Sequence, residues 1–398
     1  IYEFPSFEKG YEFRPFTMKE RLLTQTRVMF FYVGQILVPN IGNMQLFHDE
    51  IPISQSLWQP VTTIISMVGL FVLVAAAFFA RARAKLISLA IGWFLIGHLV
   101  ESSFVSLELV HNHRNYFPMI GIAIALGGAL AKYAHHNPRL AWCVAGVVSL
   151  FLSVSTHLRA ADWSSWEVFV VTEAEKNPGS SRSQYEAGRY YYWLVERAGK
   201  NNYKKENYDE SVRYFEAGTS ASETSLASLA ALIRLADMVG SPPKKEWKDL
   251  MLERIGTRRP DPNDINKVGD VFRCRIDDKC SVDIKFLSEV AAATLANKNL
   301  PGFTRGSIAS AASALALKEQ RGDFAIYYAM QALVASPVTF EFFLNAMKLA
   351  RICGDRELAD TLMKEYLSPF SAPDQKKRID QEYSILIKEL SEHHDANS

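Results

Sequence analysis

Two short polar segments in the first third of the chain carry the side chains best suited to chemistry. The first, at residues 47–50, contains His48 and Asp49, and the second spans residues 101–118. The ionisable side chains of interest in the second segment are Glu101, Glu108, His113 and Arg114. A guanidinium grips phosphate in a forked geometry, and a carboxylate can act as a general base or hold a metal ion. We therefore expect a polar site for an anionic lipid headgroup, with a divalent metal ion as a further possibility.

A structural role for the same side chains is the competing interpretation. Ionisable groups at a bilayer boundary are costly unless they are paired or used. Arg114 could pair with Glu101 or Glu108 and brace the loop, and His48 and Asp49 could lock the segments together. The sequence leaves both interpretations open and identifies no catalytic residue.

Long apolar stretches flank these polar segments and must position them. Residues 61–80 carry no charge, and as a helix they would span about 30 Å of hydrocarbon. Helices are predicted near residues 22–39, 60–80, 85–101, 116–134 and 139–158. Residues 1–160 are therefore expected to form a transmembrane domain of about five helices in a lipid bilayer.

Basic residues favour one orientation of this domain. Ten basic residues lie on one side of the predicted helices. They precede the first predicted helix, lie near its start, or lie in the two loops on the same side: Lys9, Arg14, Lys19, Arg21, Arg27, Arg81, Arg83, Lys85, Lys132 and Arg139. The other two loops contain only Arg114, although Arg159 follows the last helix against the pattern. Because the basic side is usually cytoplasmic, residue 1 is expected in the cytoplasm. Residues from 161 onward would then lie in the periplasm, if this is the inner membrane of a bacterium.

Pairs of amphipathic helices are predicted from residue 161. Gly322-Asp323 and Gly354-Asp355 recur 32 positions apart, each between two apolar helical segments. A period near 34 with small residues at the turn is typical of tetratricopeptide repeats, which stack into a curved array with a concave face. We predict an all-α protein with a tetratricopeptide-like domain over residues 161–390 and a disordered tail over 391–398.

Cys274 and Cys280 enclose a short loop, and on the oxidising side of a membrane they are expected to form a disulfide. A zinc site would need four ligands, and no Cys or His pair lies near. The net charge of +1 gives no reason to expect nucleic acid as a partner. Because the chain opens at Ile1 without an initiator Met, it is expected to be a fragment that lacks its N-terminal part.

Four segments carry a family resemblance: residues 20–27 (ERLLTQTR), His48-Asp49, residues 101–103 (ESS) and residues 113–118 (HRNYFP). With them the chain resembles bacterial membrane proteins that have C-terminal tetratricopeptide repeats. That group is similar to the eukaryotic transmembrane-and-tetratricopeptide O-mannosyltransferases of the GT-C class.

This resemblance implies a polyprenyl-phosphate sugar donor and a protein or peptide acceptor held on the concave face. It also implies donor-phosphate contacts from Arg114 and His113. The acidic catalytic residue of GT-C enzymes lies in a first extracytoplasmic loop that nothing in this chain matches, so no catalytic residue is carried over. The leading expectation is the C-terminal part of a GT-C glycosyltransferase, and the alternative is a non-enzymatic membrane-anchored scaffold for envelope or pilus assembly.

Overall fold

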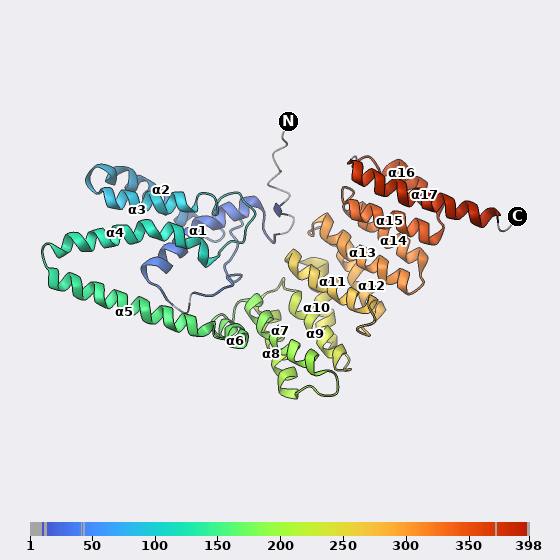
Figure 1. Ribbon diagram of the computed structural model, residues 1–398, viewed down its shortest axis with the longest axis horizontal. Helices are drawn as coiled ribbons and strands as arrows, with labels where there is room; N and C mark the ends of the chain where they lie inside the picture. The colour runs from blue at the N-terminus through green and yellow to red at the C-terminus, as the bar shows by residue number, and fades with distance from the viewer. Residues whose placement is uncertain (1–9, 12–13, 41, 43, 371, 396–398) are drawn as a thin grey trace. The chain divides into compact units, whose positions relative to one another are not determined.

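The computed structural model describes residues 10–11, 14–40, 42, 44–370 and 372–395. The regular elements of these residues are helices (Figure 1), so the predicted all-α class is confirmed for this part of the chain. The chain divides into two compact units. Unit 1 comprises Ile1–Tyr191 with Ser220–Ser222, and unit 2 comprises Tyr192–Thr219 with Glu223–Ser398. Each unit is described by itself.

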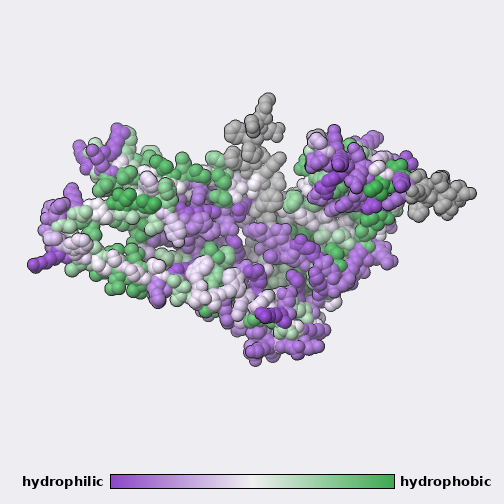
Figure 2. Space-filling view, viewed as in Figure 1, coloured by the Kyte–Doolittle hydropathy of each residue, from purple (hydrophilic) through white to green (hydrophobic). Residues whose placement is uncertain are grey.

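Unit 1 contains two hairpins of apolar helices. α2 (Thr62–Arg83) turns into α3 (Lys85–His98), and α4 (Tyr116–Ala134) turns into α5 (Pro138–Asp162). By length and composition α2, α4 with the short helix η3 (Asn112–Asn115), and α5 can cross a membrane, whereas α3 is a shorter apolar helix. Figure 2 shows a broad hydrophobic surface over these helices. An exposed apolar surface of this extent fits contact with lipid.

The two ends of the hairpins differ in chemistry. The hairpin end, residues 81–85 and 132–139, is rich in Lys and Arg. There the Asn137 side chain accepts the backbone N–H of Leu140 at 3.1 Å, which caps the start of α5. The loop end consists of the first loop (residues 38–61) and the second loop (residues 99–115). Both polar segments identified from the sequence therefore lie at one end of the hairpins.

α1 (Met18–Leu37) also lies at the loop end. It begins at a capping box, in which Thr17 and Glu20 each accept the other's backbone N–H through a side-chain oxygen. The segment before it is held by the second loop, because the Tyr11 hydroxyl donates to the Phe104 carbonyl at 2.7 Å. The chain thus enters α1 on the side where the loops lie.

The second loop follows α1 along its length. Arg21, near the start of α1, donates to several carbonyls of this loop. Tyr32, near the end of α1, exchanges hydrogen bonds with the backbone of His111. The expected crossing over residues 22–39 is therefore not found, and among the described residues three helices, rather than five, are long and apolar enough to cross. Polar side chains that face the second loop lower the hydropathy of α1, which explains the difference.

Unit 2 begins within α7, and its helices stack on one another. The helices after α5 are α6 (Trp166–Lys176), α7 (Ser181–Ala198), α8 (Lys205–Ala221), α9 (Ala227–Met238), α10 (Lys245–Thr257), α11 (Pro262–Ile276), α12 (Ile284–Ala296), α13 (Gly302–Lys318), α14 (Gly322–Ala335), α15 (Phe340–Cys353), α16 (Arg356–Glu365) and α17 (Pro373–Asp395). α9 contacts α11, α10 contacts α12, and α11 contacts α13. This contact of each helix with the next but one is typical of stacked helix pairs. Assignment of these pairs to the tetratricopeptide class stays a prediction.

The last two helix pairs follow the sequence pattern closely. Gly354 ends α15 with φ of 67°, a left-handed conformation that favours glycine. Asp355 then caps α16, because its carboxylate accepts the Leu358 N–H at 2.9 Å. The disordered tail expected over residues 391–398 is wrong in part, since α17 is helical as far as Asp395. Residues 396–398 lie outside the described residues, as do residues 1–9, on which the expectation of a truncated N-terminus rests.

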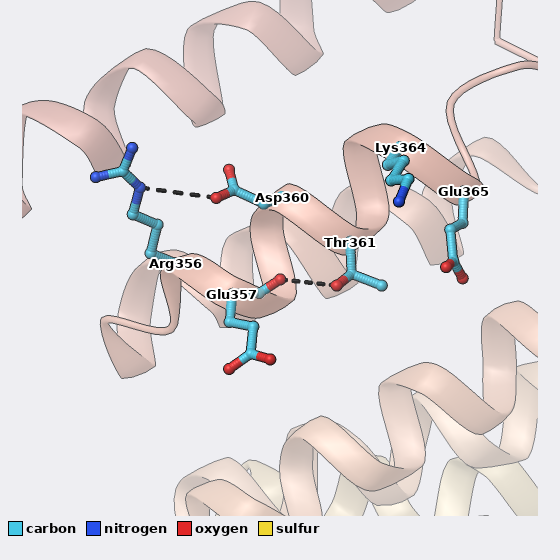
Figure 3. Close-up of a pocket in the computed structure, with 6 residues that line it drawn as sticks. All are labelled: Arg356, Glu357, Asp360, Thr361, Lys364 and Glu365. Atoms are coloured by element: carbon cyan, nitrogen blue, oxygen red, sulfur yellow. Dashed lines mark hydrogen bonds and ion pairs between the residues drawn. The ribbon is translucent and has the colours of Figure 1, made fainter.

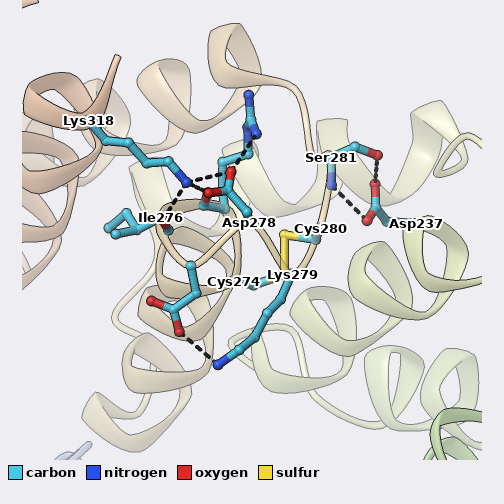
Figure 4. The surroundings of a disulfide bond; sticks show 10 residues. Asp237, Cys274, Ile276, Asp278, Lys279, Cys280, Ser281 and Lys318 are labelled. Atoms are coloured by element: carbon cyan, nitrogen blue, oxygen red, sulfur yellow. Dashed lines mark hydrogen bonds and ion pairs between the residues drawn. A yellow bond between two sulfur atoms is a disulfide. The ribbon is translucent and has the colours of Figure 1, made fainter. Parts of the chain in front are cut away.

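A disulfide joins Cys274, near the end of α11, to Cys280, with their Cα atoms 5.5 Å apart. Figure 4 shows how the enclosed loop is fixed on both sides. Lys318 of α13 donates to backbone carbonyls of the loop. Ser281 donates to the Asp237 carboxylate of α9 through both its N–H and its hydroxyl. The bridge therefore closes a loop that connects neighbouring helices.

We expect Cys280→Ser to lower the free energy of unfolding by roughly 2–3 kcal/mol, because the bridge restricts the unfolded chain. Urea unfolding of the purified protein, followed by near-ultraviolet circular dichroism, measures this loss. Cys353→Ser is the matched control, since Cys353 is a free, exposed thiol. Reaction of both Cys274 and Cys280 with a maleimide in denatured, non-reduced protein would contradict the bridge.

Asp264, in the first turn of α11, also holds the start of α9. Its Oδ2 accepts the backbone N–H of Leu226 at 2.6 Å and that of Ala227 at 3.3 Å. Burial raises the pKa of Asp264 from 3.8 to about 6, against the opposing effect of these hydrogen bonds. Because the pKa of Asp264 is higher in the folded state than in the unfolded state, the folded state binds this proton more tightly. The resulting stabilisation is fully present below the unfolded pKa and is lost as the pH rises through the folded pKa.

We therefore expect the stability of unit 2 to fall as the pH rises from about 4 to about 7. Asp264→Asn should reduce this dependence, because an amide does not titrate there. Thermal unfolding of the two proteins across this range tests the expectation. Asp270→Asn, a change of a carboxylate that pairs with Arg273 at the surface, should leave the dependence unaltered. An identical pH dependence in the wild type and Asp264→Asn would rule out this role.

Candidate functional site

α6 and α7 hold the first loop at the loop end. The Asp49 carboxylate accepts hydrogen bonds from the hydroxyls of Ser180 and Ser181 and from the backbone N–H of Arg182. These groups belong to the start of α7, where a carboxylate is favourable because of the unpaired N–H groups. The Asp49 side chain, considered from the sequence for a polar site, is thus engaged in capping a helix.

His48 is buried between the two loops, with its side chain 2% exposed. Its Nδ1 lies 3.5 Å from Glu50 Oε1, and its Nε2 lies 3.2 Å from Asn112 Oδ1 in the second loop. Asn177 donates to Glu50 Oε2 at 3.0 Å. Burial opposes ionisation of Glu50, but hydrogen bonds from His48 and Asn177 outweigh it and lower the pKa of Glu50. His48 therefore connects the two loops with each other.

Arg114 lies inside the second loop, with its side chain 9% exposed. Its Nη1 donates to the Glu108 carbonyl at 2.6 Å, and its Nε lies 3.5 Å from Glu101 Oε2. The Glu108 carboxylate in turn pairs with Arg182 Nη1 at 3.2 Å. These are the contacts that the bracing interpretation requires. The donor-phosphate role of Arg114 stays a prediction.

A pocket of about 580 Å³ opens at the loop end beside α4 and α5. Its lining contains both polar and apolar side chains. The lining residues that matter here are His111, Asn112, His113, Arg159, Met119 and Leu152. His113, expected to contact a donor phosphate, thus lies on the pocket, whereas Arg114 is not among the lining residues.

His111 and His113 lie side by side on the pocket, with their ring centroids 4.1 Å apart. Burial lowers the pKa of His111, and so do the neighbouring His113 and Arg114. We therefore expect the His111 imidazole to be uncharged at neutral pH, with a nitrogen that can still donate a hydrogen bond. Asn112, between them in the chain, is held by its donation to the Gln45 carbonyl at 2.7 Å.

Arg159 provides the cation of the pocket, and two carboxylates hold it. Its Nη1 lies 2.8 Å from Glu173 Oε1 and 3.2 Å from Asp162 Oδ2. Glu173 Oε2 accepts the backbone N–H of Leu46 at 2.6 Å, which fixes the carboxylate. Sequence reasoning noted Arg159 only as an exception to the charge pattern. Its place directly after an apolar stretch, in the last turn of α5, was the signal that could have identified it.

A second depression lies beside α16 in unit 2 (Figure 3). Its residues come from one helix, and they interact with each other: Arg356 Nε lies 3.7 Å from Asp360, and Thr361 donates to the Glu357 carbonyl at 2.8 Å. Such pairs are ordinary on a solvated helix face. The pocket at the loop end is therefore the stronger candidate site.

The pocket combines hydrogen-bond donors with apolar walls, so it can accommodate an amphiphile that has an anionic headgroup. Among the described residues, no three His, Cys, Asp or Glu side chains are grouped to hold a metal ion. The sequence matches no protein-family model and none of the curated proteins.

Proposed function

We propose that the chain is the C-terminal part of a GT-C-type membrane glycosyltransferase that uses a polyprenyl-phosphate-linked sugar. The pocket at the loop end is the observation that supports this proposal. A lipid-linked phosphate needs hydrogen-bond donors for its charge and an apolar surface for its first isoprene units. Donors from His113 and Arg159 and apolar side chains from α4 and α5 line one pocket, which suits such a ligand.

The proposed location is a bacterial inner membrane with unit 2 in the periplasm. Lys and Arg at the hairpin end favour a cytoplasmic position for that end. A disulfide in unit 2 favours an oxidising compartment for that unit. The stacked helices of unit 2, as a tetratricopeptide-like array, would hold a protein or peptide acceptor on a concave face.

A membrane-anchored scaffold for envelope or pilus assembly is the second candidate. The contacts of Asp49, Glu101, Glu108 and Arg114 favour it, because these ionisable groups all have structural partners. If the protein is a scaffold, the polar loops only join the membrane helices to α7, and the pocket binds no substrate.

Sugar transfer distinguishes the two candidates. Radiolabelled polyprenyl-phosphate sugars are incubated with an envelope protein extract and membranes that contain the full-length protein. We expect label to enter protein only when the full-length protein is present, whereas a scaffold would give no transfer with any sugar. A strain that lacks the gene should in addition lose sugar from periplasmic proteins, as measured by mass spectrometry.

A further inference from the structure

The arginines at the loop end differ in how many of their donors are already used. Arg21 donates to loop carbonyls through Nε, Nη1 and Nη2. Arg114 uses Nη1 for the Glu108 carbonyl and turns Nε toward Glu101. Neither lines the pocket. Both guanidinium groups are therefore engaged in fixing the second loop.

Arg159 is different because its described contacts with Glu173 and Asp162 both involve Nη1. Among the described residues, its Nε and Nη2 have no hydrogen-bond partner. These two nitrogens form the edge of the guanidinium that binds phosphate or carboxylate in parallel. The side chain is 16% exposed and lines the pocket.

The surroundings hold this arginine in place before any ligand binds. The Glu173 side chain is 2% exposed and is itself fixed by the Leu46 N–H. A buried charge is costly without a partner, so Glu173 and Asp162 stabilise the guanidinium near the membrane boundary. The conformational entropy of this long side chain is therefore lost when the protein folds, and ligand binding does not require a further loss.

We propose that Arg159 binds the phosphate of the lipid ligand through its Nε–Nη2 edge, with His113 as a second donor. This inference rests on the proposed function and names the cation at that site. It assigns a structural role to Arg114 and a ligand-binding role to Arg159. Met119 and Leu152 line the same pocket and would contact the lipid chain. A lipid phosphate should therefore bind more tightly than inorganic phosphate.

Binding of farnesyl phosphate to the full-length protein in nanodiscs tests the proposal without requiring the acceptor. Radiolabelled ligand and equilibrium dialysis give the dissociation constant, and farnesol and inorganic phosphate serve as competitors. We expect Arg159→Lys to weaken binding about tenfold, because an ammonium cannot make two parallel bonds, and Arg159→Ala about a hundredfold. Arg114→Lys is the matched control and should stay within about twofold of the wild type.

Arg159→Lys keeps a cation beside Glu173, so thermal unfolding without ligand should remain close to that of the wild type. If folded Arg159→Lys and Arg159→Ala bind as tightly as the wild type, Arg159 is not the phosphate contact. Weaker binding by Arg114→Lys alone would return that role to Arg114. If the wild type does not bind farnesyl phosphate, the lipid-phosphate function and the role of Arg159 both fail. If inorganic phosphate competed as strongly as farnesyl phosphate itself, the site would bind phosphate without a preference for a lipid chain. That result would overturn only the claim that the ligand is a lipid.

Discussion

A cysteine at Thr17 should react with a membrane-impermeant maleimide in intact spheroplasts as readily as a cysteine at Ser164. Cysteines at Arg83 and His136 should react only after the membrane is permeabilised. Thr17 precedes α1 at the loop end, and Ser164 follows α5 at the same end, whereas the other two positions lie at the hairpin end. If both hairpins, α2–α3 and α4–α5, cross the membrane and α1 does not, the chain should enter and leave on one side.

The labelling uses a background in which the free thiols Cys143 and Cys353 are replaced by serine. Gel shift after maleimide treatment measures the fraction that reacts. Thr17 is exposed, so accessibility within the fold should not limit its reaction. If Thr17 instead behaves like Arg83, the helix over residues 18–37 crosses the membrane and the five-span expectation is restored.

The apolar hairpins could be predicted from sequence because the membrane imposes a simple condition. A helix that crosses hydrocarbon must satisfy its own backbone and expose apolar side chains. Residues 62–83, 116–134 and 138–162 meet that condition without reference to the rest of the chain. Repeated Gly-Asp turns likewise act locally, as at Gly354, where the left-handed conformation ends α15.

α1 could not be assigned in this way because its partners are distant in sequence. Arg14, Arg21 and Arg27 were counted as cytoplasmic charges, yet each donates to a backbone carbonyl at the loop end. Tyr32 and Gln25 add further bonds of this kind, to the backbone at His111 and Leu109. A count of basic residues does not distinguish a solvated charge from one that holds a loop.

The candidate site shows the same limit at the level of single atoms. In the sequence, both Arg114 and Arg159 lie next to an apolar stretch. Because both are arginines, the residue type does not distinguish their roles. The difference is which nitrogens are used: Arg114 points into its own loop, while Arg159 is held by one nitrogen beside a pocket. Glu173, which holds Arg159 there, lies in α6 and gave no signal of this contact in the sequence.

Replacement of Arg21 should have the largest effect on stability in unit 1. Its side chain is completely buried and donates to the carbonyls of Glu101, Ser103, Leu107 and Glu108. Arg21→Ala would remove the donor from the carbonyls of Glu101, Ser103 and Leu107, whereas the Glu108 carbonyl would still accept from Arg114. Each buried unpaired group costs about 1–3 kcal/mol. We expect a loss of at least about 3 kcal/mol, which is enough to prevent accumulation of folded protein.

The amount of monodisperse protein after detergent extraction, and its thermal unfolding, measure this effect. Lys19→Ala is the matched control because Lys19 is an exposed basic residue in the same turn of α1, and it should change stability by less than about 0.5 kcal/mol. Arg21→Lys should resemble Arg21→Ala more than the wild type, since one ammonium cannot reach four carbonyls that a planar guanidinium contacts. If Arg21 acted only as a topogenic charge, Arg21→Lys would behave as the wild type and Lys19→Ala would be as harmful as Arg21→Ala. The two variants therefore separate a charge that orients the chain from a side chain that holds the second loop in its fold.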